Sequence, residues 1–308
     1  MATKQPSILV VGAGKAGATI AAALATASWA TTVLCRAPGR ASALRRWFGN
    51  NALQVSIVRT VASVAVDVPV LFATADRDLA AAAAQIAASG VPHSAPWLHL
   101  SGVAPPAILD VPGGSTTTGS CHPLCAILGP ADDDRPLAVV LAPLQGALFA
   151  LAGDPPALRL GHAIASACGG LPHEVATDVR AAYHAAASVV ANDLVGLLAI
   201  GEKLCHQAGL PEGVARPALL HLARTSLDAL ALASTRAGSS LADGLTGAVG
   251  RGDAGTLQAH FDAMSRDPAA QHAHALLSSQ LVALVRSKLA QAQHDALTTT
   301  IAAVLAKR

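Results

Sequence analysis

Short apolar runs alternate with alanine-rich segments over the first half of the chain. Ile8–Val11, Val68–Ala73 and Trp97–Leu100 are such runs. Apolar runs of this length, bounded by turn residues, are typical of strands buried on both faces of a parallel sheet. The segments at about 15–28 and 79–88 have a helical composition, since alanine favours helix. The alternation predicts a doubly wound, mostly parallel α/β sheet.

The strand pattern continues to Leu151, and the pattern changes from Val179 onward. Leu53–Val58 and Gly119–His122 are further predicted strands, and Leu137–Leu141 and Leu148–Leu151 look like two closing strands. From Val179 onward the chain has long helical patterns and hardly any strand signal. We therefore expect an α/β domain over residues 1–178 and an all-helical domain over residues 179–308.

The first predicted strand runs directly into a glycine-rich turn with the spacing GxGxxG. The first glycine allows a tight turn, the second allows close approach of a pyrophosphate, and the third lets the following helix pack on the strand. The unpaired N–H groups at that helix start attract phosphate. Dinucleotide binding is the favoured reading, and an alanine- and glycine-rich packing turn is the alternative. The expected contacts are Gly12, Ala13, Gly14, Lys15, Ala16 and Gly17.

The end of the second strand, Thr32–Cys35, favours NADP over NAD. NAD-specific folds usually carry Asp or Glu here against the ribose 2′-hydroxyl, whereas this chain continues Cys35-Arg36 and reaches Arg40. Two guanidinium groups can accept a 2′-phosphate. Alternatively, both arginines solvate a surface loop. Thr74 and Ala75 follow another predicted strand and are expected on the cofactor side of the sheet.

Composition restricts the class of protein. The chain has 308 residues, enough for two domains, with a net charge of +2 and 3% aromatic residues. It lacks the basic stripe or stacking platform of a nucleic-acid surface. Five scattered cysteines do not form a disulfide framework, which predicts a cytoplasmic protein. Glycines and Lys15 interrupt the apolar stretch from Ser7 onward, so no membrane span is expected there.

The segment Ala181–Gly201 is apolar nearly all round, which predicts a helix buried at the centre of a domain or interface. His184, Ser188 and Asn192 are four residues apart and share one face, while Tyr183 is expected to point elsewhere. His184 is a candidate acid or base, and Asn192 is a candidate for orienting a carbonyl or imine. A satisfied internal hydrogen-bond network is the alternative.

A second polar group contains Cys121, His122 and Cys125. One C-x3-C without a second pair is poor zinc spacing, so buried thiols and a structural or substrate-facing His122 are favoured, and no metal is expected. Ser101 follows another predicted strand, Trp97–Leu100. No metalloprotease HExxH, GxSxG elbow or P-loop pattern is present.

The order of these motifs resembles a known family, the Rossmann-like NADP-binding proteins with an uncharacterised C-terminal helical domain. The architecture is similar to that of 6-phosphogluconate dehydrogenase, pyrroline-5-carboxylate reductase and ketopantoate reductase. The resemblance implies an NADP-dependent oxidoreductase whose helical domain forms a homodimer, with the substrate between the domains. It is carried by the glycine turn, Ser101-Gly102, the HPL at His122–Leu124, the YHAAA at Tyr183–Ala187 with Asn192, and the LTGAVGRGD at Leu245–Asp253.

Some positions depart from the family. Cys125 and Ala126 stand where members commonly have glutamine and an aromatic residue, and Ala248 replaces a proline. The β-hydroxyacid dehydrogenase relatives carry a catalytic lysine early in the first long helix, where this helix has none before Lys203. If the sites are equivalent, His184 takes the place of that lysine.

Together the motifs predict hydride transfer between NADPH and a small carbonyl or imine compound. His184 would supply the proton, because imidazole ordinarily titrates near neutral pH. Ser188 and Asn192 would hold the substrate, with Ser101 and His122 facing it from the cofactor side. The alternative is a non-catalytic NADP-binding sensor or scaffold, in which the His184 face is only core.

Overall fold

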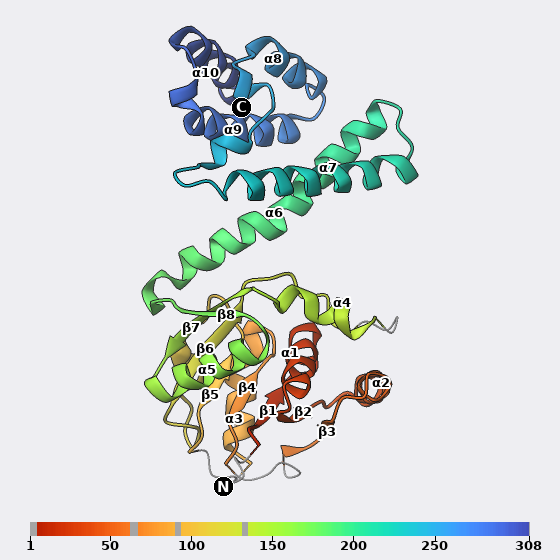
Figure 1. The fold of residues 1–308 in the computed structure, drawn as a ribbon, viewed down its shortest axis with the longest axis vertical. Coiled ribbons are helices and arrows are strands. Elements are labelled where there is room, and N and C mark those ends of the chain that lie inside the picture. The colour runs from red at the N-terminus through yellow and green to blue at the C-terminus, as the bar shows by residue number, and fades with distance from the viewer. Residues whose placement is uncertain (1–4, 62–66, 90–93, 131–134, 308) are drawn as a thin grey trace. The chain divides into compact units, whose positions relative to one another are not determined.

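The computed structural model describes residues 5–61, 67–89, 94–130 and 135–307. The chain divides into two compact units, residues 1–191 and 192–308. The first unit is built on an eight-stranded sheet with the order β3-β2-β1-β4-β5-β6-β7-β8. Every neighbouring pair is parallel except the antiparallel pair β6 and β7. The predicted fold class, a mostly parallel Rossmann sheet followed by an all-helical part, is confirmed (Figure 1).

The strands have the following bounds: β1 Ser7–Val11, β2 Ala30–Leu34, β3 Val55–Val58, β4 Val70–Phe72, β5 Trp97–His99, β6 Thr118–Pro123, β7 Leu148–Gly153 and β8 Leu171–Glu174. The α-helices are α1 Lys15–Thr26, α2 Pro38–Asn50, α3 Leu79–Ala87, α4 Leu137–Leu141, α5 Pro155–Ala167, α6 Arg180–Gln207, α7 Glu212–Ala233, α8 Ala254–Ala263, α9 Pro268–Leu284 and α10 Gln291–Leu305.

Strand β1 separates two hydrophobic cores, because successive side chains point to opposite faces of a sheet. Ile8 and Val10 pack in the core that contains the α1 residues Ala18 and Ile20. Leu9 packs in the other core, together with buried residues of α3. The central strand is thus buried on both faces, as its continuous apolar sequence indicates.

Residues 137–141, predicted to form a strand, form the short helix α4, and this prediction was wrong. Val140 is the buried residue of that helix, which lies against α1. A run of five apolar residues fits a strand and a buried helix equally well, so periodicity alone did not decide between them. The sequence did not predict strand β8, because this strand has only four residues and most of them are exposed.

The second unit contains the rest of α6 and helices α7 to α10. Leu257 and Phe261 of α8, Val282 of α9 and Leu297 and Ile301 of α10 belong to its hydrophobic core. Helix α9 has an N-cap: the side chain of Asp267 accepts a hydrogen bond from the amide of Ala270 at 3.2 Å, and Pro268 is the first helical residue.

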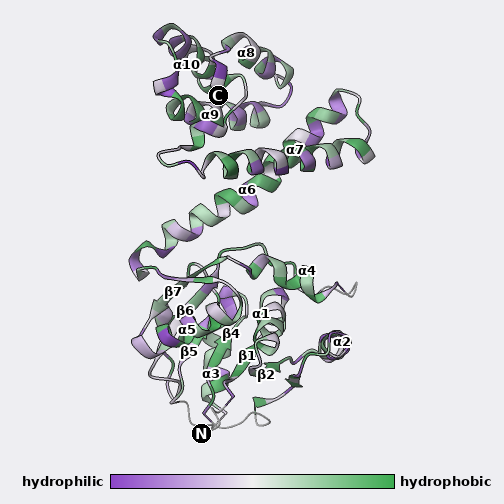
Figure 2. Ribbon diagram, viewed as in Figure 1, coloured by the Kyte–Doolittle hydropathy of each residue, from purple (hydrophilic) through white to green (hydrophobic). Residues whose placement is uncertain are grey.

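Helix α6 is not buried at the centre of a domain, so that part of the prediction was wrong. Val189, Val190 and Val195 are 60%, 71% and 66% exposed. Figure 2 shows hydrophobic residues along both α6 and α7. By length and composition alone, Thr177–Gln207 is also apolar enough to cross a membrane, which is weak evidence for a span. Exposed apolar patches of this kind are typical of interaction sites.

The expected boundary between residues 178 and 179 lies just before α6, whose first three turns belong to the first compact unit. The division of labour, with NADP binding by residues 1–178 and substrate binding and dimerisation by residues 179–308, stays a prediction.

Candidate functional site

The glycine turn between β1 and α1 has a backbone that larger residues would disrupt. Gly12 has a φ of +112°, and a Cβ on it would lie 2.7 Å from the carbonyl oxygen of Ala73. A Cβ on Gly17 would collide with the carbonyl oxygen of Gly12. A Cβ on Gly14 would meet no atom within 4 Å, so the backbone there borders open space. No side chain caps the start of α1, and uncapped N–H groups at a helix start favour an anion.

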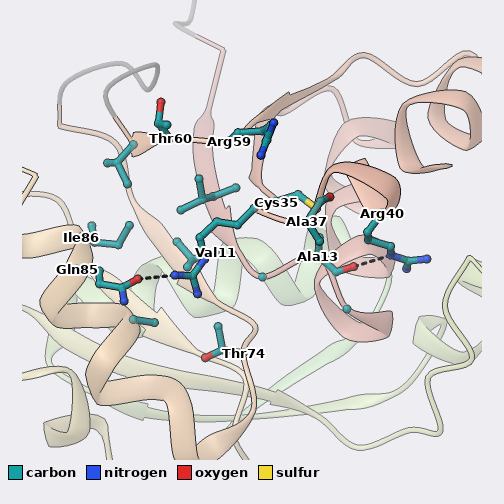
Figure 3. Close-up of a pocket in the computed structure, with 16 residues that line it drawn as sticks. Val11, Ala13, Cys35, Ala37, Arg40, Arg59, Thr60, Thr74, Gln85 and Ile86 are labelled. Atoms are coloured by element: carbon teal, nitrogen blue, oxygen red, sulfur yellow. Dashed lines mark hydrogen bonds between the residues drawn. The ribbon is translucent and has the colours of Figure 1, made fainter. Parts of the chain in front are cut away.

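A cavity of about 610 Å³ lies beside this turn (Figure 3). It is lined by the carboxyl ends of β1 and β2, the segment after β3, and α3. Of the predicted cofactor contacts, Gly12, Ala13, Gly14, Cys35, Arg36, Arg40 and Thr74 line it, whereas Lys15, Ala16, Gly17 and Ala75 do not. Our sequence reasoning missed Arg59, Thr60, Gln85 and Ile86. The signal for Arg59 was its position directly after the predicted strand that ends at Val58.

The three arginines around the cavity have different roles. Arg40 donates from Nε to the carbonyl oxygen of Ala13 at 3.0 Å (Figure 3). Its Nη2 donates to the carbonyl oxygen of Pro130 at 3.4 Å. Arg40 thereby ties the glycine turn to the loop after β6. Arg36 donates from Nη1 to Oε1 of Gln85 at 2.9 Å, and Arg59 is exposed. Arg36 and Arg59 are the guanidinium groups better placed for a ligand.

The chemistry of this lining fits a phosphate-rich dinucleotide. In the part of the chain that the structure describes, three arginines and no carboxylate line the cavity. The hydroxyl of Thr74 is buried without a hydrogen-bond partner among the described residues. Buried polar atoms are normally paired, so this hydroxyl is available to a ligand. The residues present therefore suit NADP.

A second polar group lies at the carboxyl ends of β5 and β6. The amide of Ser101 donates to Nδ1 of His99 at 3.1 Å, and Oγ of Ser101 accepts from the amide of Ala104 at 2.9 Å. Ser101 thus fixes the turn that carries Gly102. A Cβ on Gly102 would collide with Nδ1 of His184 and lie 3.0 Å from Nε2 of His122. The absence of a side chain at Gly102 lets these two histidines meet.

The start of α6 brings its side chains to the same place. The His184 and His122 rings lie edge to face, with centroids 5.6 Å apart. The prediction that Tyr183 points elsewhere was wrong, because its hydroxyl and Nδ1 of His122 share a hydrogen bond of 2.9 Å. Arg180 donates from Nη2 to the carbonyl oxygen of Ser101 at 2.6 Å. Our sequence reasoning missed Arg180, although it precedes His184 by one helical turn.

Burial keeps the side chains of His99, His122 and Tyr183 uncharged. Burial, with the positive charge of Arg180 acting in the same direction, lowers the pKa of His99 and of His122 to about 4. Burial raises the pKa of Tyr183 to about 12. His99, His122 and Tyr183 are therefore neutral at pH 7. Nδ1 of His184 is buried against Gly102, whereas its Nε2 is not buried.

We expect the free energy of unfolding to fall as the pH drops from about 6.5 to about 4. In this range the unfolded chain protonates His99 and His122 while the folded chain does not, so the stability that their neutral forms provide is complete above pH 6.5 and is lost toward pH 4. Each histidine contributes a slope of up to about 1.4 kcal/mol per pH unit. Denaturant titrations across this range measure the slope.

The variant His122→Gln should have a shallower slope, since it removes one of the two histidines. The exposed His221 provides the matched control, and His221→Gln should leave the slope unchanged. An unaltered slope in His122→Gln would contradict a neutral, buried imidazole at this position.

The remaining predicted residues lie apart from these contacts. Ser188 is half-buried one turn beyond His184, and Asn192 is exposed and begins the second unit. Both make further interactions. Cys121 is buried and its Sγ lies 3.9 Å from the carbonyl oxygen of Gly161, on the strand face opposite to His122. Among the described residues, no group of three His, Cys, Asp or Glu side chains could hold a metal ion.

Comparison with known protein families finds one model that matches part of the chain. The model of a domain of unknown function, DUF2520, matches the segment from β7 to α9. The matched residues are 147–281. The matched segment includes the YHAAA and LTGAVGRGD motifs and covers less than half of the chain. No match was found among curated proteins.

Solved structures resemble nearly the whole chain. Protein TM1727 from Thermotoga maritima has a TM-score of 0.66 at 20% identity, covering 91% of this chain and 99% of its own. Protein BF3122 from Bacteroides fragilis, provisionally named an NADP oxidoreductase, has a TM-score of 0.64 at 20% identity, covering 90% and 98%. The pyrroline carboxylate reductase of Plasmodium falciparum, solved with NADP bound, has a TM-score of 0.54 at 11% identity, covering 89% and 99%.

These likenesses establish the fold and confirm the resemblance expected from the motifs. The DUF2520 match begins at β7, after the first six strands of the sheet.

Proposed function

We propose that this protein is an NADP-dependent oxidoreductase that transfers a hydride between NADPH and a small carbonyl or imine compound. The observation that carries the proposal is the meeting of His184 and His122 across Gly102, at the carboxyl ends of β5 and β6. Ligands of open α/β sheets bind outside the carboxyl ends of the strands, and the glycine-turn cavity lies at the same edge of the sheet.

The chain's own residues supply the cofactor site. The N–H groups at the start of α1 and the open backbone at Gly14 would hold the pyrophosphate, and Arg36 and Arg59 the 2′-phosphate. Thr74 and Cys35 would contact the nucleotide from the ends of β4 and β2. When bound there, NADPH supplies the hydride.

The α6 residues would handle the substrate. Nε2 of His184 would deliver the proton, because Nδ1 of the same ring faces Gly102 and leaves the other nitrogen with solvent contact. His122, held by the hydroxyl of Tyr183, would fix the orientation of that ring. Ser101, Ser188 and Asn192 would hold the substrate. We assign NADP binding to residues 1–178 and substrate binding to residues 179–308.

The direct test is NADPH consumption with a panel of small ketones, aldehydes, oxo acids and cyclic imines, followed by absorbance. We expect turnover with at least one carbonyl or imine class. NADPH binding by calorimetry without turnover of any panel member would instead support a non-catalytic NADP sensor, and absence of NADPH binding would contradict both readings.

We further propose that the exposed apolar surface of α6 and α7 is covered by a second copy of this chain. Val190 on α6 is 71% exposed and Leu232 on α7 is 72% exposed, and exposed apolar patches mark interaction sites. Analytical ultracentrifugation without detergent should detect a dimer, and Val190→Glu/Leu232→Glu should shift it toward the monomer. Recovery of the wild type only in the membrane fraction would contradict this proposal.

A further inference from the structure

Arg180, the first residue of α6, is a buried cation whose hydrogen bonds are incomplete. Only 1% of its surface is exposed. Its Nη2 donates to the carbonyl oxygen of Ser101, but Nε and Nη1 are buried without a hydrogen-bond partner among the described residues. Buried polar atoms are normally paired, so two open donors on one guanidinium require an explanation.

Arg180 also lacks a counter-charge. None of the ion pairs in the described part of the chain includes it, and burial lowers its pKa without a carboxylate to oppose that effect. A buried charge without a partner costs several kcal/mol. The nearby His99 and His122 are neutral, so neither offsets the charge of the guanidinium. The folded chain thus holds a positive charge that an anion would stabilise.

The position of Arg180 links it to the proposed chemistry. His184 follows Arg180 by four residues on α6, and such residues are neighbours on one face of a helix. The Ser101 carbonyl that anchors the guanidinium directly precedes Gly102, against which His184 packs. Tyr183 and His184 are half-buried on this face, so their side chains would have to shift to admit a ligand.

We propose that Arg180 binds an anionic group of the substrate, namely a carboxylate on the carbon next to the carbonyl or imine that is reduced. This inference rests on the proposed function. The planar guanidinium matches the geometry of a carboxylate. With the carboxylate held one helical turn from His184, the adjacent oxygen or nitrogen lies within reach of the proton donor. The substrates are therefore 2-oxo acids or cyclic 2-imino acids.

Two matched pairs of compounds test this class: pyruvate against methyl pyruvate, and 1-pyrroline-2-carboxylate against 2-methyl-1-pyrroline. We expect a higher kcat/KM for the acid of each pair. Arg180→Gln should reduce the preference for the acid by about 10- to 100-fold, the usual effect of losing a hydrogen bond to a charged group. Arg224→Gln, at an exposed position on α7, is the matched control and should leave the preference unchanged.

Calorimetric binding of oxamate, an unreactive carboxylate, and of its neutral counterpart oxamide gives a readout independent of turnover. The wild type should bind oxamate more tightly, and Arg180→Gln should lose the difference. If Arg180→Gln does not fold, Arg180→Lys takes its place in the experiment. Lysine keeps the charge but not the planar donors, so the preference for oxamate over oxamide should fall only in part.

The outcomes separate the two proposals. Oxamate binding that depends on Arg180, without NADPH turnover of any compound, would support the anion site and contradict the proposed reaction. Turnover with no preference for the acids, or an undiminished preference in the folded Arg180 variant, would overturn the anion site alone. A purely structural Arg180 would change the melting temperature and leave the acid preference intact.

Discussion

Replacing His184 with alanine should lower kcat/KM for the NADPH-dependent reduction by about 100- to 10,000-fold, the range that a general acid contributes. The reason is geometric: Nδ1 of His184 is buried against Gly102, which leaves Nε2 as the nitrogen that can deliver a proton. The affinity for NADPH should stay unchanged, because His184 does not line the glycine-turn cavity. Steady-state kinetics and NADPH calorimetry on the same variant measure the two effects.

Several variants sharpen this test. His221→Ala changes an exposed histidine on α7 and should retain wild-type rates. Gly102→Ala should also lower kcat/KM while His184 is intact, because the added Cβ would displace the imidazole. Asn192→Ala tests the proposed substrate contact. Near-wild-type rates in both His184→Ala and Asn192→Ala would rule out this face of α6 as the site. An imine substrate, which arrives protonated, would make the dependence on His184 weaker.

NADPH should bind more tightly than NADH, and Arg36→Ala or Arg59→Ala should each reduce that preference by about 10- to 100-fold. Both side chains line the cavity at the ends of β2 and β3, where no carboxylate of the described residues repels a 2′-phosphate. Arg40→Ala should act differently, since Arg40 holds the glycine turn through Ala13. It should weaken NADPH and NADH alike.

Calorimetry with 2′,5′-ADP and 5′-ADP isolates the phosphate contribution without any catalytic step. The ratio of the two affinities should fall in Arg36→Ala and Arg59→Ala and stay constant in Arg40→Ala. Arg46→Ala is the control, because Arg46 is exposed on α2 and does not line the cavity. Equal affinities for NADPH and NADH in the wild type, or an unchanged preference in Arg36→Ala/Arg59→Ala, would contradict this prediction.

The sequence alone determined the central architecture of this protein. The apolar run of β1, the GxGxxG turn and the alanine-rich α1 follow one another without interruption, and their physical requirements agree with one another. Buried parallel strands need continuous apolar residues, and a turn that approaches the Ala73 backbone this closely needs glycine. Requirements of this kind involve residues that are close in the sequence, so the order of residues is enough to predict them.

Only the tertiary structure decided which polar side chains meet. Tyr183 and His122 are 61 residues apart, and their hydrogen bond depends on how the start of α6 packs against the end of β6. Arg40 was an equal candidate to Arg36 until its hydrogen bonds to Ala13 and Pro130 were known. The apolar run at 137–141 became a helix because Val140 packs inward beside α1. Contacts between distant segments depend on packing that no local pattern encodes.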